Sequence, residues 1–255
     1  VSRRAGHQAA NSSDGLHADD LLLSDGIFVA AVGASPRPHL DFYGFQTTNA
    51  YGSILDFRPR GAGFDDGLTI GSPVLAIESR LIYPVHSSVT VADEGMAILA
   101  VATANKDDPR RAFEISTTYG LRPEAGIIDV RSRLLNTGTK KLEDVLFSLH
   151  DEAKRYYGYG TNVTSRQRKL RFQVVPRPDS SLGWVDLNPR DENGDPLRVS
   201  LAPGEVHEIR YALTVDSDSG RLLATIYSLL DVEAKPVVIR FEDLDPGLHE
   251  VIVRD

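Results

Sequence analysis

The 255-residue sequence contains no cysteine, and it has only one tryptophan and one methionine. Without thiols, the protein cannot form disulfide bonds, use a catalytic thiolate or bind zinc through cysteine. The absence of free thiols also suits an oxidising compartment, so we expect a periplasmic or extracellular protein.

Long hydrophobic runs are missing as well. The longest apolar stretch, from Ile27 to Ala34, is much shorter than the roughly 20 residues of a membrane-spanning helix. We therefore expect no membrane span. The first residue is Val1 and not methionine. This leads us to expect that a preceding segment was removed, either as a signal peptide or by trimming of a longer chain.

Basic residues are outnumbered by acidic ones, and the formal net charge is −8. Binding to nucleic acid requires a basic face that neutralises phosphates, so we expect no nucleic-acid partner. The sequence also contains no nucleophile elbow, phosphate-binding loop or HExxH motif. A nucleotide-dependent enzyme or a zinc protease is therefore not expected, and no cofactor is expected either.

What the sequence does contain is a series of short apolar or alternating runs separated by Gly, Pro, Asp and Asn. The clearest alternation, in Ile127–Leu134, places charged and apolar side chains on opposite faces. This pattern predicts an all-β fold, a large antiparallel β-sandwich. The expected strands are Gly26–Val32, His39–Gly44, Ala50–Phe57, Val74–Pro84, Ser87–Ala92, Met96–Ala102, Ala112–Gly120, Ile127–Leu135, Glu143–His150, Leu170–Pro176, Gly183–Leu187, Leu197–Leu201 and His207–Val215.

The chain divides into three expected parts: a flexible arm over 1–20, a β-sandwich domain over 21–215, and a linker with a C-terminal hairpin over 216–255. Within the last part, Ser219–Val232 has apolar residues at helical spacing. We expect at most this one short helix, capped by Asp216 or Ser217. A strand over Leu222–Leu230 is the alternative.

The turns follow the same sequence logic. Asn136–Thr139 and Asp191–Asp195 each place a glycine where a hairpin turn requires a positive φ.

The order of these motifs resembles the galactose mutarotase-like (aldose epimerase) supersandwich. The resemblance covers Gly26–Val215 and is best between Phe113 and His150. A Tyr119-Gly-Leu strand is followed by the Asn136-Thr-Gly turn, a histidine-bearing strand and the turn Leu201-Ala-Pro-Gly-Glu. The tail resembles the start of a carboxypeptidase-regulatory-like β domain. Proteins that join two such modules are typically exported bacterial proteins.

The resemblance implies a catalytic pair. Mutarotases use a histidine to protonate the sugar ring oxygen, and that position matches His150. A carboxylate takes the proton of the anomeric hydroxyl, and the matching region offers Asp186. The alternative is that His150 is a strand-end histidine hydrogen-bonded to a neighbour.

Aromatic residues offer a second candidate site. Flat aromatic faces stack on sugar rings, and basic groups hydrogen-bond to their hydroxyls or acids. The candidate ligand-binding residues are Arg155, Tyr156, Tyr157, Tyr159 and Trp184. A tyrosine-rich loop that packs on the sheet or on a partner subunit explains the same residues.

Other polar clusters have simpler explanations. The segments His17–Asp20, His150–Glu152 and Asp191–Asp195 contain possible metal ligands, but neighbours along a chain rarely converge on one ion, so no metal is expected. The basic residues Arg166, Arg168, Lys169 and Arg171 predict a solvated face or a docking site for an acidic partner.

Three functions remain open at this point. The first is a non-catalytic module that binds carbohydrate or a surface polymer. The second is a structural subunit of an exported assembly whose partners are other protein subunits that pair with its edge strands. The third is a reduced mutarotase-type sugar epimerase.

Overall fold

The structure is a computed structural model that describes residues 2–3, 19–24, 27–34, 38–40, 46–49, 51–60, 70–82, 84–92, 97–103, 112–122, 125–151, 172–176 and 180–233. The predicted hairpin at the C-terminal end and most of the predicted arm over 1–20 lie outside these residues. The three-part division of the chain therefore stays a prediction.

Seventeen strands and one helix make up the described part of the chain. The strands are β1 (Ser2–Arg3), β2 (Leu21–Ser24), β3 (Phe28–Val32), β4 (Pro38–Leu40), β5 (Gln46–Asn49), β6 (Ile54–Pro59), β7 (Ile70–Ile77), β8 (Arg80–Ile82), β9 (Val85–Ala92), β10 (Ala97–Thr103), β11 (Phe113–Arg122), β12 (Ile127–Asn136), β13 (Leu142–Asp151), β14 (Phe172–Pro176), β15 (Ser181–Asp186), β16 (Val199–Leu201) and β17 (Val206–Asp216); the helix is α2 (Ser219–Leu229).

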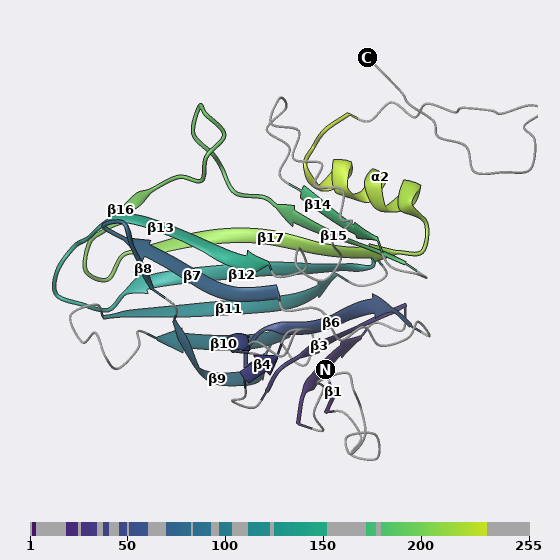
Figure 1. The fold of residues 1–255 in the computed structure, drawn as a ribbon, viewed down its shortest axis with the longest axis horizontal. Helices are drawn as coiled ribbons and strands as arrows, with labels where there is room; N and C mark the ends of the chain where they lie inside the picture. Colours follow the sequence, from purple (N-terminus) through teal and green to yellow (C-terminus); the bar gives the residue numbers. More distant parts are fainter. Residues whose placement is uncertain are drawn as a thin grey trace, which may run out of the picture.

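Fifteen of these strands form two large sheets (Figure 1), and β4 pairs with β5 in a separate two-stranded sheet. The eight-stranded sheet has the order β1-β2-β3-β6-β7-β13-β16, and β8 pairs with β7 beside this path. The seven-stranded sheet has the order β14-β15-β17-β12-β11-β10-β9. Paired strands run antiparallel, for example β11 with β12 and β12 with β17. The predicted all-β, antiparallel sandwich is confirmed.

The core lies between the two sheets because inward side chains alternate with outward ones. In β12, Ile128, Val130 and Leu134 are buried, whereas Arg131 and Arg133 between them are exposed. One large apolar cluster contains residues from both sheets, including Phe28, Phe57, Leu75, Val145 and Phe147 from one and Ile98, Ile115, Tyr119, Leu182 and Leu213 from the other. This burial is the main stabilising contribution to the fold.

Helix α2 covers one end of the outer face of the seven-stranded sheet (Figure 1). Its Leu222 and Ile226 are fully buried against Val185 and Ala212. The predicted helix is confirmed, but its cap is Asp218, whose side chain accepts a hydrogen bond from Arg221 N. With 11 residues it is the only helix in the described part, and no helix there is long and apolar enough to span a membrane.

Two details differ from the sequence predictions. The predicted strand Val74–Pro84 is interrupted, because Glu78 and Ser79 form a tight turn with φ of 49° and 63° between β7 and β8. Gly138 does not have the expected positive φ. Its N–H instead donates to Oδ1 of Asn136 at 3.0 Å, and the Asn136 side chain builds the turn. The glycine of the other turn, Gly194, does have a positive φ, of 86°.

Candidate functional site

A small cavity opens where β15 and β17 meet β13 of the opposite sheet. Its lining includes Phe147, Asp186, Arg190, His207 and Tyr211. The cavity volume is about 30 Å³, which is room for about one or two water molecules. Sites for small-molecule ligands usually measure about 300–1,000 Å³. The cavity is therefore too small for a sugar ring.

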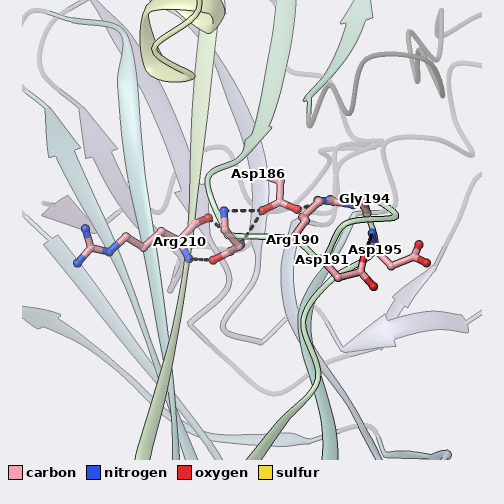
Figure 2. Close-up of polar contacts among 7 residues, drawn as sticks. Asp186, Arg190, Asp191, Gly194, Asp195 and Arg210 are labelled. Atoms are coloured by element: carbon pink, nitrogen blue, oxygen red, sulfur yellow. Dashed lines mark hydrogen bonds and ion pairs between the residues drawn. The ribbon is translucent and has the colours of Figure 1, made fainter.

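Asp186, the candidate base, lies at the end of β15, and three donors hold its carboxylate (Figure 2). Oδ1 accepts from the backbone N of Asn188 at 2.9 Å and from its Nδ2 at 2.7 Å. Oδ2 is paired with the guanidinium of Arg190. The Asp186 side chain is only 14% exposed. These bonds tie the Asp186 side chain to Asn188 and Arg190 and so anchor the segment that follows β15.

The segment after Asp186 is held by its own hydrogen bonds (Figure 2). Nη1 of Arg190 donates to the carbonyl of Gly194 at 2.9 Å. Oδ1 of Asp191 accepts from the backbone N of Asn193 and Asp195 at 2.9 and 2.8 Å. The predicted surface turn over Asp191–Asp195 is thus confirmed, and its first carboxylate bonds to the turn itself.

The described residues contain no group of three or more His, Asp or Glu side chains that could hold a metal ion. One potential ligand from the sequence, Asp20, is fully buried, and its Oδ1 accepts a hydrogen bond from Ala34 N at 3.3 Å. Its role there is structural.

Trp184 is buried in the core and does not offer an exposed ring face. Its ring stacks on that of Tyr211 with centroids 4.6 Å apart and an angle of 12° between the planes. Only 7% of Trp184 is exposed. The expected role of Trp184 as a sugar platform therefore does not fit its position, and its stacking supports the packing of β15 on β17.

Tyr211 belongs to this stack and also lines the cavity. Burial raises the pKa of its phenol, and the negative charge of Asp186 raises it further. A hydrogen bond with the backbone of Leu149 lowers the pKa by a smaller amount. Tyr211 therefore stays protonated and neutral at physiological pH.

Comparisons with known proteins find likeness only in three dimensions. No family model matches the chain, and no curated protein sequence does. An α-galactosidase from Lactobacillus brevis aligns with a TM-score of 0.49 and 11% identity, over 83% of this chain and 41% of that one. A GH36 α-galactosidase from Geobacillus stearothermophilus gives 0.46 and 8%, over 78% and 40%.

A polysaccharide lyase aligns with a TM-score of 0.42 and 13% identity, over 81% of this chain and 35% of that one. The chain therefore spans about two fifths of the length of these proteins. Likeness at this level has no bearing on the activity or the ligand of the chain.

The candidate catalytic pair comes from opposite sheets. His150 lies near the end of β13, where its backbone pairs with Ser72 of the eight-stranded sheet, whereas Asp186 belongs to the seven-stranded sheet. The side chain of His150 is outside the described part of the structure, and so are the residues Arg155, Tyr156, Tyr157, Tyr159, Arg166, Arg168, Lys169 and Arg171. Their roles stay predictions.

Sequence reasoning missed His207, which also lines the cavity. The ring of His207 lies edge-on to Phe147 with centroids 6.5 Å apart. Partial burial lowers the pKa of the imidazole, so the neutral form is favoured. Its inward position follows from the alternation His207, Ile209, Tyr211 along β17. That signal was present in the sequence, since these residues alternate with Glu208 and Arg210.

Proposed function

We propose that the chain is a non-catalytic module of an exported protein and that it binds carbohydrate or another surface polymer. The observation that carries the proposal is that neighbouring residues of the chain bind the carboxylate of Asp186. A general base needs a free lone pair within hydrogen-bond reach of the proton that it removes. Arg190 and Asn188 supply three donors to the two oxygens of Asp186, and its side chain is only 14% exposed, so a substrate hydroxyl has little access to the carboxylate. The adjoining cavity has room only for water, so a polymer would be bound on the surface of the sandwich.

Aromatic contacts to the sugar rings are assigned to Tyr156, Tyr157 and Tyr159, with Arg155 beside them. Aromatic rings offer the flat faces that stack on sugars, and a guanidinium hydrogen-bonds to hydroxyl or carboxylate oxygens. The burial of Trp184 leaves these three tyrosines to supply the platform.

Affinity electrophoresis in gels that contain single polysaccharides tests this proposal. We expect at least one polysaccharide to retard the protein, and the triple variant Y156A/Y157A/Y159A to abolish the retardation. The matched control, Y156F/Y157F/Y159F, keeps the rings and should bind. Polarimetry of freshly dissolved α-D-galactose should show no acceleration of mutarotation. Acceleration that is lost in His150→Ala would instead establish the epimerase.

An assembly role is the second candidate, and the edge strand β9 favours it. His86 is the only ionisable side chain among the eight residues of β9, and Val91 is 51% exposed. Among the described strands, β10 is the partner of β9, which ends the seven-stranded sheet. Uncharged edges of this kind pair readily with other chains. Native mass spectrometry tests the idea: pairing between copies gives a dimer that Val91→Lys dissociates, and a wild-type monomer contradicts it.

A further inference from the structure

The outer face of the seven-stranded sheet has two different halves. At one end, α2 covers an apolar area that includes Ile127, Val185 and Ala212. Farther along β12 and β17, the outward residues are Arg131, Arg133, Glu208 and Arg210, and all three arginines are more than half exposed. We call these four residues the arginine face.

The three guanidinium groups of the arginine face share one carboxylate. The Nε atoms of Arg131, Arg133 and Arg210 lie 3.6, 4.0 and 2.8 Å from oxygens of Glu208. Strand register places Arg133 directly opposite Glu208, but it places Arg131 directly opposite Arg210. Like charges at such positions destabilise a sheet. Because an arginine is always protonated, the arginine face carries an excess of positive charge.

Three other exposed arginines in the described part of the chain each have a carboxylate of their own. Arg122 pairs with Asp129, Arg198 with Asp144 and Arg221 with Asp216. Among the described residues, the group of three arginines around Glu208 differs from these single pairs. Folding gains little from it, because exposed ion pairs contribute at most about 1 kcal/mol each.

We propose that the arginine face binds the carboxylates of an acidic polysaccharide. This inference rests on the proposed function and identifies the chemical class of the polymer. Guanidinium groups bind carboxylates through paired hydrogen bonds. Arg131 and Arg133 lie about 7 Å apart along one strand, so an extended chain with a carboxylate on successive sugars can contact both.

The neighbouring strand adds groups that suit sugar hydroxyls. Ser116 and Thr118 of β11 lie directly opposite Arg133 and Arg131 on the same outer face, and both are partly exposed. Hydroxyl groups donate and accept hydrogen bonds, as sugar hydroxyls do. The arginine face has no aromatic side chain on which a base could stack. A polysaccharide with carboxylates therefore fits better than a nucleic acid.

The test compares polygalacturonate with the same polymer after methyl esterification, which removes the charge and keeps the sugars. We expect the wild-type protein to bind polygalacturonate at least about tenfold more tightly than the ester, with affinity that falls as salt is added. Three exposed charge contacts that contribute about twofold to fivefold each predict a loss of about tenfold to a hundredfold in R131Q/R133Q/R210Q. Glu208→Gln removes the competing carboxylate and should tighten binding about twofold or more.

The matched control is R122Q/R198Q/R221Q, which lowers the net charge by the same three units but alters arginines that have their own carboxylates. It should bind polygalacturonate as the wild type does, apart from a small long-range effect of less than about threefold. Circular dichroism confirms that both triple variants are folded, and Glu208→Gln tests the same face without removing an arginine.

Several results would overturn the inference. One is an equal loss of affinity in both triple variants, and another is unchanged binding by Glu208→Gln. Tighter binding of poly-glutamate or of single-stranded DNA than of polygalacturonate would assign the face to an acidic protein or to nucleic acid. If the ester or a neutral galactan binds as well as polygalacturonate, the inference fails and the proposed function stands. If no polysaccharide binds, both fail.

Discussion

Gly52 is the position where a single methyl group should disturb the fold most. It lies in the turn before β6, and its φ of +79° is a conformation that side chains other than glycine rarely adopt. A Cβ built at Gly52 would lie 2.4 Å from Cδ2 of His86, which is a buried residue of β9. The carbonyl of Gly52 accepts a hydrogen bond of 2.8 Å from the hydroxyl of Tyr119 in β11. Gly52 therefore joins the eight-stranded sheet to two strands of the other sheet.

The cost of Gly52→Ala has three parts. The left-handed backbone costs about 1–2 kcal/mol for a residue with a Cβ. Displacing the ring of His86 in a packed core adds about 1–3 kcal/mol. If the shift breaks the bond to Tyr119, a buried hydroxyl loses its acceptor, at about 1–3 kcal/mol. We expect a loss of about 4 kcal/mol in the free energy of unfolding, which is a large part of the typical total of about 5–15 kcal/mol.

Urea denaturation followed by circular dichroism measures this loss. Gly204→Ala is the matched control, because Gly204 has the same φ of +79° but nothing lies within 4 Å of its added Cβ. It should cost about 1–2 kcal/mol, from the backbone alone. Adding His86→Ala to Gly52→Ala should cost less than the two single changes together, since the small side chain makes room. Equal costs for Gly52→Ala and Gly204→Ala would refute the reasoning.

Three further predictions follow from buried polar groups and from the helix cap. Burial lowers the pKa of His86 from 6.5 to about 4, so the unfolded chain takes up the proton first. The contribution of neutral His86 to the free energy of unfolding should be fully present above about pH 6.5 and should fall by about 3 kcal/mol by pH 4. Urea titrations of His86→Phe over that pH range should lack this part of the loss. Asn136→Ala removes hydrogen bonds to the carbonyls of Lys140 and Leu201; it should cost about 2–4 kcal/mol, and a Tm decrease of less than about 3 °C would contradict this. Asp218→Ala removes the cap of α2 and should lower the free energy of unfolding by about 1 kcal/mol. Ser217→Ala, at the neighbouring position, should change it little in the same thermal assay.

The fold was predictable from the sequence where one face of a sheet is exposed to solvent and the other faces the core. β12 matches the predicted strand Ile127–Leu135 to within one residue, because polar and apolar side chains alternate along it. The turn between β7 and β8 was not predictable in the same way. Glu78 and Ser79 take positive φ angles there, although turns of this kind favour Gly, Asn or Asp. Pairing of Leu75 with Ile82 overrides the local preference.

The candidate site was less predictable, because its residues depend on pairing between distant strands. β15 is buried on both faces, one against the core and the other under α2. Its sequence therefore does not reveal that Trp184 faces inward. The outward charges of Arg131 and Arg133 were visible in the alternation of β12. Their common contact with Glu208 was not, because it requires the register of β12 with β17.

The two turn motifs that underlie the mutarotase resemblance form a single structural feature. The backbone N of Asn136 donates to the carbonyl of Glu205 at 3.1 Å, and Gly204 N donates to the carbonyl of Asn136 at 2.8 Å. The Glu205 carboxylate accepts from Ala202 N at 2.8 Å and so closes the second turn on itself. These bonds join the end of β12 to the start of β17.

Because their polar groups bond to one another, the two motifs are explained by the architecture alone. Asn136 is fully buried, and a buried amide with all its bonds inside the protein has no contact with a ligand. A resemblance based on such turns therefore reflects how strands are joined and leaves the chemistry open. The function has to be argued from side chains that fold stability does not require, and among the described residues the arginine face meets that condition best.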